Sequence, residues 1–283
     1  MRLRVIKIPA AVECLFVFLL LSLNLSGQST APQPFDRHDL NGIWNRTGGD
    51  RGYNNQVPPM TPTGMEKFNS YKPSYGRDLA SSDAAAHPEE HIGRRRAVPP
   101  ALGNDPTGEC NPSGVPRLLF FPRPIEFVQT AEKVIQFFKW TRAWRDIWTD
   151  GRELPIEPPV FTWYGYSVGK WDGDTFVVDS TGFDERSWID HFGYPHSDEM
   201  HLQERYRRID HDHLELTMTI TDPKTYSQPW ESQKKVFTLQ PRGAKIVTNE
   251  GWFGLLEEIC APVDEVDQFN SRIRDRSVNG TKK

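Results

Sequence analysis

Apolar and polar residues alternate along several short stretches in the second half of this chain. The clearest stretch covers residues 214–221, in which the apolar residues Leu214, Leu216, Met218 and Ile220 alternate with Glu215, Thr217, Thr219 and Thr221. A period of two places all the apolar side chains on one face of a β-strand. The pattern therefore predicts a strand that packs one face against a core.

Turn signals divide the same region into hairpins. Residues 164–183 flank the dipeptide Asp172-Gly173, which suits a tight two-residue turn because both positions tolerate positive φ. Residues 124–140 and 201–221 have similar polar breaks in their middle. Roughly eight to ten short strands without intervening helices favour a mainly β fold, an antiparallel barrel or sandwich. We assign the barrel to residues 124–262.

The segment that precedes this region is irregular. Residues 30–123 are rich in Pro, Gly, Asn and Ser, with a first strand predicted at 39–45. A short helix is predicted from Pro62, with Thr61 as its N-cap and Phe68 facing inward. Irregular chain of this length usually wraps a scaffold and often shapes a site. Residues 263–283 are expected to form a flexible tail.

The N-terminus has the features of a bacterial-type signal peptide. Residues 1–29 combine three basic residues, an apolar run at 15–25 and small residues after it. That run is shorter than the roughly 20 residues that a membrane-spanning helix needs. We therefore expect an exported protein, periplasmic or secreted, without stable membrane insertion after cleavage.

Charge and motifs narrow the possible partners. The formal net charge is −4, and no long basic tract is present, which argues against a nucleic-acid partner. There is neither a glycine-rich phosphate loop nor a Cys-x-x-Cys-His motif. The sequence therefore predicts no cofactor, and a small molecule is the expected partner.

Two cysteines, Cys110 and Cys260, remain after removal of the signal peptide, which takes Cys14 with it. In an oxidising compartment such a pair is more often a disulfide than two free thiols. The alternative is a nucleophilic cysteine, but no histidine is near either residue in the sequence. We predict a Cys110–Cys260 disulfide.

The densest group of chemically active residues is the stretch "WIDHFGYPHSDEMHLQERYRR", residues 188–208. Its three histidines, His191, His196 and His201, are spaced by five residues. Neither a helix nor a strand brings residues at that spacing to one face. Because no zinc-type spacing is present either, we predict no metal site.

An acid–base pair is the stronger hypothesis for this stretch. His196, with Asp190 and Glu204 as orienting carboxylates, is the candidate catalytic group, because a histidine beside carboxylates can titrate near neutral pH. If 201–209 is a strand, Glu204 or Arg205 points inward and needs a partner, for which Asp222 is available. The alternative is an exposed strand with solvated charges and a loop histidine held by hydrogen bonds.

Aromatic residues near this stretch suggest a binding surface. The candidates for stacking against a ligand are Trp163, Tyr164, Tyr166 and Trp188, with Arg205 and Asp222 as polar partners. Ring faces combined with a few fixed polar groups suit sugars or aromatic ligands. The alternative is a barrel mouth that its own loop packs shut.

The stretch "DLNGIWN", residues 39–45, resembles the Gly-x-Trp signature that begins the first strand of lipocalins and other calycin barrels. The stretches "CNPSGVPRLL", "WTDGRELP", "WYGYSVGKWDGDTFVVDSTGF" and "PHSDEMHLQERYRR" resemble a largely uncharacterised family of exported bacterial proteins. The resemblance to lipocalins implies a barrel with few short helices and a cavity for a small, mostly apolar ligand. A minority of such barrels are enzymes acting on hydrophobic substrates.

Three functions follow as hypotheses. The first is an exported barrel that binds a small hydrophobic, aromatic or sugar-like ligand. The alternative is a hydrolase, lyase or isomerase that uses His196 with its carboxylates in the same barrel. The second alternative is an interaction protein of the cell envelope, which would use the aromatic surface as an interface.

Overall fold

The computed structural model describes residues 34–47, 52–74 and 96–241, together with Leu255, Glu258 and Cys260. The chain divides into two units, Met1–Pro34 and Phe35–Lys283, and all that follows concerns the second. The predicted signal peptide, the predicted C-terminal tail and most of residues 242–262 of the predicted barrel lie outside the described residues.

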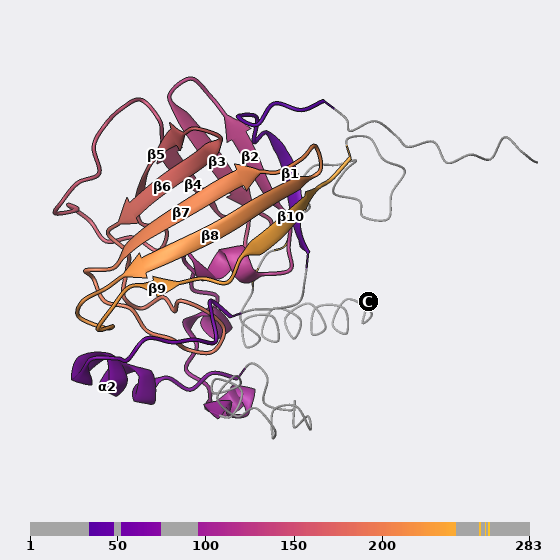
Figure 1. Cartoon of the computed structure of the whole chain (residues 1–283). Coiled ribbons are helices and arrows are strands. Elements are labelled where there is room, and N and C mark those ends of the chain that lie inside the picture. The colour runs from indigo at the N-terminus through magenta and orange to yellow at the C-terminus, as the bar shows by residue number, and fades with distance from the viewer. Residues whose placement is uncertain are drawn as a thin grey trace, which may run out of the picture. The chain divides into compact units, whose positions relative to one another are not determined.

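Within the described residues, ten strands form one sheet (Figure 1). They are β1 (Gly42–Thr47), β2 (Ile125–Gln129), β3 (Lys133–Phe138), β4 (Trp144–Trp148), β5 (Tyr166–Asp172), β6 (Thr175–Thr181), β7 (His201–Arg208), β8 (His213–Thr221), β9 (Trp230–Glu231) and β10 (Lys235–Leu239). The helical elements are short: α2 (Pro62–Ser70) and the 3₁₀ helices η2 (Pro100–Leu102), η3 (Pro106–Glu109) and η4 (Arg117–Phe120).

The sheet closes into a nine-stranded barrel because β10 pairs with both β1 and β8. Strand β9 extends the sheet beside β8. The predicted fold class, a mainly β, lipocalin-like barrel with few short helices, is confirmed. One pairing departs from the antiparallel prediction: β4 and β5 run parallel, because residues 149–165 return along the barrel before β5 begins.

The hairpins follow the predicted pattern. Strands β5 and β6 pair from Asp172↔Thr175 onward, and Gly173 in the turn has the positive φ of +57° that the turn requires. Along β8, Leu214, Leu216, Met218 and Ile220 are buried, whereas the residues between them are more exposed. The apolar face predicted from the period of two therefore faces the core.

Helix α2 is also confirmed. Thr61 is its N-cap and accepts a hydrogen bond from the Gly64 amide at 3.0 Å, and Phe68 is buried against Tyr194. Gly64 has a packing role as well, because a Cβ there would lie 2.4 Å from the carbonyl oxygen of Thr225. The helix thus rests directly on the connection after β8.

Trp44, from the Gly-x-Trp stretch, is completely buried near one end of the barrel. Its indole N–H donates to the carbonyl of Leu40 at 2.9 Å, and the Arg208 guanidinium lies 5.3 Å from its ring centre. Arg208 also donates to the carbonyl of Asp39 at 2.7 Å. The chain that leads into β1 is thereby fixed at the end of the barrel where β7 finishes.

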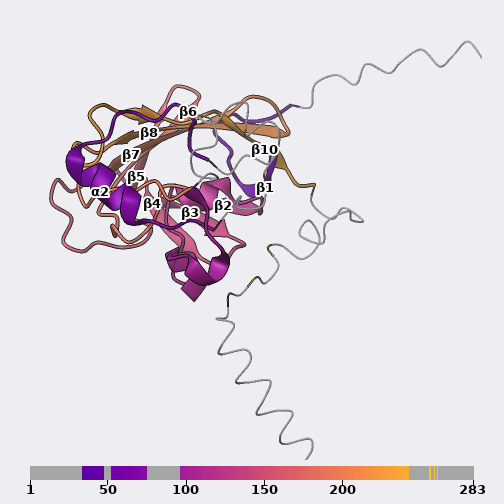
Figure 2. The ribbon, with the colours of Figure 1, turned by 90° about the horizontal axis from the view of Figure 1, so that it is seen from below.

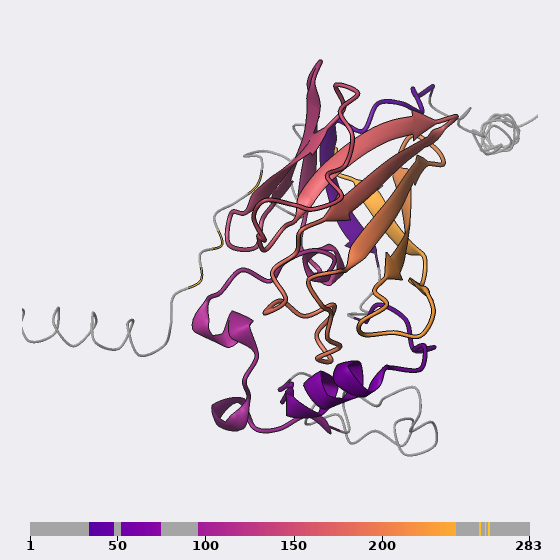
Figure 3. The ribbon, with the colours of Figure 1, turned by 90° about the vertical axis from the view of Figure 1, so that its left-hand side faces the viewer.

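The opposite end of the barrel, where β7 begins, carries most of the irregular chain. We call it the end cap and define it as residues 52–74, 96–123 and 182–200. Figures 1 and 3 show α2 and the magenta segment with η2 and η3 at this end, and in Figure 2 this end faces the viewer. No helix in the described part of the chain is both long and apolar enough to cross a membrane.

Candidate functional site

Glu204, one of the predicted catalytic residues, lies inside the barrel on β7 and is completely buried. Arg145 on β4 donates to both of its carboxylate oxygens, at 2.8 and 2.6 Å. The Tyr206 hydroxyl donates to Glu204 at 2.6 Å, and Arg145 Nε donates to Gln136 at 2.7 Å. The sequence predicted that an inward-pointing charge on this strand would need a partner. That partner is Arg145, which the sequence analysis did not identify.

Burial and the neighbouring charges determine the protonation states of Arg145 and Tyr206 in this network. Burial alone would lower the pKa of Arg145, but the adjacent Glu204 carboxylate raises it above its ordinary value. Burial, together with the negative charge of Glu204, raises the pKa of Tyr206 well above its usual range. At neutral pH Arg145 is therefore charged and Tyr206 is a neutral phenol, and both are hydrogen-bonded to Glu204.

His196 lies in the end cap and is completely buried. Its Nδ1 lies 2.9 Å from the Ser197 carbonyl oxygen, and its Nε2 lies 2.8 Å from Ser187 Oγ. A carbonyl oxygen can only accept, so Nδ1 carries the proton and Nε2 accepts from the Ser187 hydroxyl. Because burial lowers the pKa of His196, the ring is neutral at neutral pH.

Asp190 is buried at a different point of the end cap. Its carboxylate accepts from the amides of Tyr53 at 3.1 Å and Phe192 at 2.8 Å. Burial raises the pKa of Asp190 to about 6, although these hydrogen bonds and the charge of Arg117 oppose the shift. The carboxylate therefore joins the chain after β1 to the connection between β6 and β7.

The three predicted catalytic residues are thus not brought together. Both ring nitrogens of His196 are occupied by Ser187 and the Ser197 carbonyl, so neither Asp190 nor Glu204 orients the ring. For His196 the placement matches the alternative of a loop histidine held by hydrogen bonds. For Glu204 the alternative of a solvated charge is wrong.

The predicted polar pair Arg205 and Asp222 is also separated. Arg205 lies on the outer face of β7 and pairs with Asp172 at 3.1 Å. Asp222 is buried and accepts from the Ser197 amide at 2.7 Å and from the Ser197 hydroxyl at 2.6 Å. It fixes the residue next to His196 and is not the partner of a charge on β7.

The four predicted stacking residues do not form one surface. Trp188 is buried and stacks on Tyr71 with their ring centres 4.9 Å apart. The Tyr166 hydroxyl accepts from Arg152 at 3.1 Å on an exposed side. Trp163 and Tyr164 line two different cavities.

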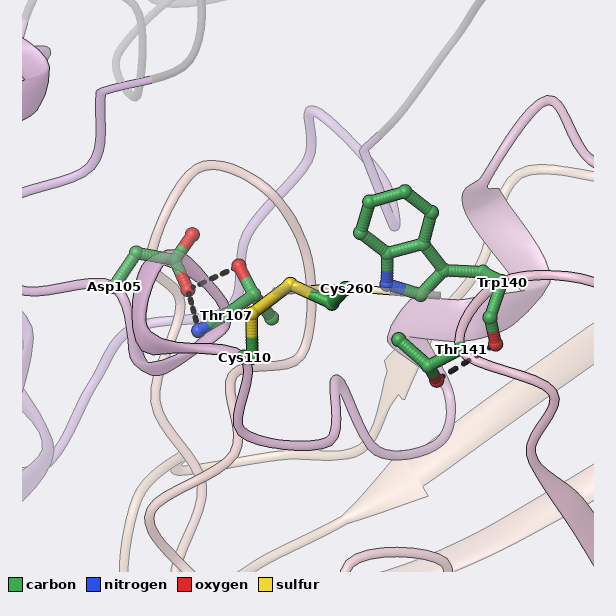
Figure 4. Close-up of a disulfide and its surroundings, with 6 residues drawn as sticks. All are labelled: Asp105, Thr107, Cys110, Trp140, Thr141 and Cys260. Carbon is green, nitrogen blue, oxygen red and sulfur yellow. Dashed lines mark hydrogen bonds between the residues drawn. A yellow bond between two sulfur atoms is a disulfide. The ribbon is translucent and has the colours of Figure 1, made fainter. Parts of the chain in front are cut away.

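The predicted disulfide between Cys110 and Cys260 is confirmed. Cys110 follows η3 directly and has a positive φ of +61°. Figure 4 shows the disulfide between the turn that carries Asp105 and Thr107 and the segment Trp140–Thr141. The bridge therefore holds η3 beside the connection between β3 and β4, where both cavities lie.

The larger cavity has a volume of about 730 Å³. Its lining residues come from the end cap and from the adjacent barrel loops: Ser74, Gly103, Asn104, Asp105, Pro106, Thr107, Gly108, Glu109, Asn111, Trp140, Trp163 and Arg186. We call it the tryptophan cavity, after Trp140 and Trp163. Sequence reasoning identified Trp163 alone among these residues.

One side of the tryptophan cavity is built from Trp163 and Arg186. The Arg186 guanidinium lies 4.8 Å from the centre of the Trp163 ring. Asp184 accepts from Arg186 Nε at 2.9 Å and from Nη2 at 2.5 Å, which orients the guanidinium over the indole. Two-thirds of the Arg186 side chain is still exposed, so it can bind a ligand while it remains stacked.

The η3 turn forms another part of the lining, and hydrogen bonds hold it in place. Asp105 caps the turn by accepting from the Thr107 amide at 3.0 Å. Arg117, which is almost completely buried, donates to both oxygens of Asp105, at 2.8 and 2.5 Å. Burial would raise the pKa of Asp105, but the hydrogen bonds and charge of Arg117 hold it below its usual value. The carboxylate therefore stays ionised and keeps the turn in place.

Trp140 adds an aromatic wall to the cavity. Its ring stacks on Phe121 at a centre distance of 5.1 Å, which fixes the orientation of the indole. The buried indole N–H of Trp140 has no hydrogen-bond partner among the described residues. Buried donors are normally paired, so this N–H is an exception, and Trp140 contributes its ring to the cavity lining.

Searches among protein-family models, curated proteins and solved structures found no match to this chain. In the part of the chain that the structure describes, no group of three or more His, Cys, Asp or Glu side chains is placed to hold a metal ion.

Proposed function

We propose that this protein is an exported β-barrel that binds a small sugar-like ligand in the tryptophan cavity. The observation that carries the proposal is the cavity itself: two indoles, a stacked guanidinium and several amide and carboxylate groups line about 730 Å³. This volume is within the range of roughly 300–1,000 Å³ that is usual for small-molecule sites.

The barrel interior is the less suitable place for a ligand. Aromatic side chains from several strands fill it, including Phe127, Phe138, Phe176 and Phe237, all 2% exposed or less. The Glu204–Arg145 pair crosses it with its hydrogen bonds satisfied by the barrel itself. Small barrels are commonly filled by their own side chains, and a ligand there would have to displace an ion pair.

The chemistry of the tryptophan cavity favours a ring with several hydroxyl groups. Indole faces pack against the apolar face of a sugar ring. The Asn104 amide is already bonded to the backbone of Lys72 and Ser70. Glu109 and the amide of Asn111 line the cavity and offer hydrogen-bonding groups, and Arg186 adds donors above Trp163. A purely apolar ligand would leave these polar groups without partners, at a cost in affinity.

Export is supported by the Cys110–Cys260 bridge, because stable disulfides are typical of oxidising compartments. The features of residues 1–29 and the resemblance to exported bacterial proteins support it further. A ligand site that faces outward at the end of a barrel is also compatible with capture of a solute outside the cytoplasm.

Isothermal titration calorimetry of the oxidised protein against a panel of mono- and disaccharides, aromatic acids, fatty acids and steroids tests the proposal. We expect one saccharide class to bind, and Trp163→Ala to weaken that binding at least tenfold, because alanine removes the stacking face. Trp144→Ala is the matched control, since Trp144 is an exposed tryptophan outside this cavity. The proposal fails if no saccharide binds, or if both variants bind the sugar as the parent does.

A hydrolase is the second candidate, and one observation favours it. Ser187 Oγ lies 2.8 Å from Nε2 of the neutral His196 ring, which is the arrangement of a nucleophile and its base. The Asp184 carbonyl oxygen, at 3.1 Å, competes with Nε2 for the hydroxyl proton. Ser187 is also close to the tryptophan cavity: a Cβ on Gly114 would lie 2.8 Å from both Ser187 Cβ and the Trp163 carbonyl oxygen. In this mechanism Ser187 Oγ attacks an ester carbonyl while its proton passes to His196 Nε2. The ester C–O bond then breaks, the alcohol leaves with that proton, and water, deprotonated by His196, hydrolyses the acyl-serine.

A fluorophosphonate probe distinguishes this candidate, because it labels activated serines covalently. Labelling of the parent and its absence in Ser187→Ala would support the hydrolase. Ser180→Ala is the matched control, since Ser180 is a buried serine that is bonded to another serine, Ser167. If the parent is not labelled, Ser187 and His196 have a structural role in the end cap.

A further inference from the structure

The η3 turn and Trp140 both line the tryptophan cavity, although they are separated in the sequence. Figure 4 shows the Cys110–Cys260 disulfide between them. Cys110 lies directly between Glu109 and Asn111, and both of these neighbours line the cavity. The disulfide is therefore attached to the wall of the proposed binding site itself.

The start of η3 does not depend on the disulfide. Asp105 accepts from the almost completely buried side chain of Arg117, and Asn104 bonds to the backbone of Lys72 and Ser70. These bonds join the start of the turn to distant parts of the end cap. They involve no sulfur atom, so reduction of the cysteines leaves them in place.

The end of η3 is held differently. The amides of Cys110 and Asn111 bond at 3.2 and 3.1 Å to the carbonyl oxygens of Thr107 and Pro106, within the same turn. In the described part of the chain, the bond that ties this end to a distant segment is the disulfide, which spans 150 residues of sequence. Reduction therefore leaves Glu109 and Asn111 on a turn whose end has local hydrogen bonds alone.

Cys260 is fixed beside the other wall of the cavity. Two residues before it, Glu258 forms a β-bridge with Trp140, and its carboxylate oxygens accept from Arg123 Nε at 2.8 and 2.7 Å. The disulfide thus links η3 covalently to the segment that lies beside Trp140. When the bond is formed, it sets the spacing of the two walls; when it is broken, the end of η3 can move away from Trp140.

A second cavity, of about 620 Å³, gives a redox partner access to the sulfur atoms. Both cysteines line it, together with Trp144 and Tyr164, and both are only partly buried. A small disulfide or thiol can therefore reach the bond without unfolding of the barrel.

We propose that oxidation of Cys110 and Cys260 is a switch that orders the η3 wall and makes the tryptophan cavity competent to bind. This inference rests on the proposed saccharide site and describes its regulation. The oxidant is a disulfide: one cysteine thiolate attacks it to form a mixed disulfide, and the other cysteine then displaces the remaining thiol. Two electrons pass to the oxidant, and the two cysteine protons end on the two released thiols. Because disulfides form in oxidising compartments, the switch activates the cavity after export.

Hydrogen–deuterium exchange, followed by mass spectrometry of peptides, tests the switch without any ligand. The oxidised protein is compared with protein reduced by tris(2-carboxyethyl)phosphine. We expect residues 105–111 to exchange roughly tenfold faster after reduction, because the end of the turn opens locally. Residues 201–221 of β7 and β8 should exchange as before. Treatment with oxidised glutathione should restore the slow exchange of residues 105–111.

Calorimetric titration of both forms with the mono- and disaccharide panel measures the effect on binding. The reduced protein should bind the saccharide roughly tenfold more weakly, because its turn occupies the binding conformation for a smaller fraction of the time. The double variant Cys110→Ser with Cys260→Ser is the matched control, since serine resembles a reduced cysteine and leaves the reductant no disulfide to act on. It should behave as the reduced parent does, with and without reductant.

The switch is overturned if residues 105–111 exchange equally fast in both forms, or if the reduced protein binds a saccharide as tightly as the oxidised protein does. Faster exchange of the whole barrel after reduction would also overturn it, because the disulfide would then stabilise the entire fold. If the oxidised protein binds no saccharide, the proposed function fails, and the exchange of residues 105–111 alone decides whether oxidation orders the η3 wall.

Discussion

In the barrel interior the charges of Glu204 and Arg145 neutralise each other, whereas in the end cap Asp190 and Asp222 are held by backbone amides. The first arrangement joins side chains that two strands already place opposite each other. The second joins loops that no regular pairing would hold together. The buried ion pair thus fills part of the barrel interior, whereas the buried carboxylates of the end cap determine the path of its loops.

The largest expected change in stability comes from removing one member of the Glu204–Arg145 pair. We expect Arg145→Met to lower the free energy of unfolding by about 3–5 kcal/mol, because it leaves the Glu204 carboxylate buried without its cation. Urea unfolding followed by tryptophan fluorescence measures the change. The double variant Arg145→Met with Glu204→Leu should be more stable than Arg145→Met alone. A single variant that costs under about 1 kcal/mol would show that the pair is not desolvated.

A second test concerns Asp190 in the end cap. Its pKa of about 6 exceeds that of an unfolded aspartate, so between pH 4 and 6 the folded state retains a proton that the unfolded state has lost. The contribution of Asp190 to the free energy of unfolding therefore falls as pH rises through this window, by on the order of 3 kcal/mol.

Urea unfolding of the parent and of Asp190→Asn from pH 4 to 7 measures this effect. The free energy of unfolding of the parent minus that of the variant should decrease as pH rises. A loss of stability that the asparagine side chain causes equally at every pH does not affect this slope. A difference that rises with pH would mean that the amides of Tyr53 and Phe192 outweigh the burial of the carboxylate.

The smallest expected effect belongs to a charge outside both regions. The pair of Arg205 with Asp172 is exposed, with 41% and 66% of the two side chains accessible. Arg205→Ala should lower the free energy of unfolding by less than about 1 kcal/mol, because water screens exposed pairs. A loss of 2 kcal/mol or more in the same urea assay would place Arg205 in a larger network.

The strands could be predicted from the sequence because their burial follows the period of the residues, as in β8. Helix α2 was predictable because Thr61 and Pro62 are local signals. The partner of Glu204 was not, since Arg145 is distant in the sequence. One signal was present: Arg145 precedes Ile147 by two residues on a strand, so it shares the inward face.

The candidate site was harder to predict. The residues of the tryptophan cavity come from irregular chain that long-range contacts position, such as the bond of Arg117 to Asp105, and no period in the sequence indicates such contacts. His196 attracted attention because carboxylates are near it in the sequence. Its actual partner, Ser187, precedes it by nine residues and is brought back to it by the turn of the connection between β6 and β7.

The parallel pairing of β4 and β5 determines where this protein can accept insertions and deletions. A hairpin would join these strands by a short turn, but parallel strands need a connection that runs back. That connection, residues 149–165, delivers Trp163 and Tyr164 to the two cavities and exposes Ile156 almost fully. Its outer part can gain or lose residues without shifting the register of either strand. Changes in this one segment therefore alter the lining of both cavities while the barrel stays constant.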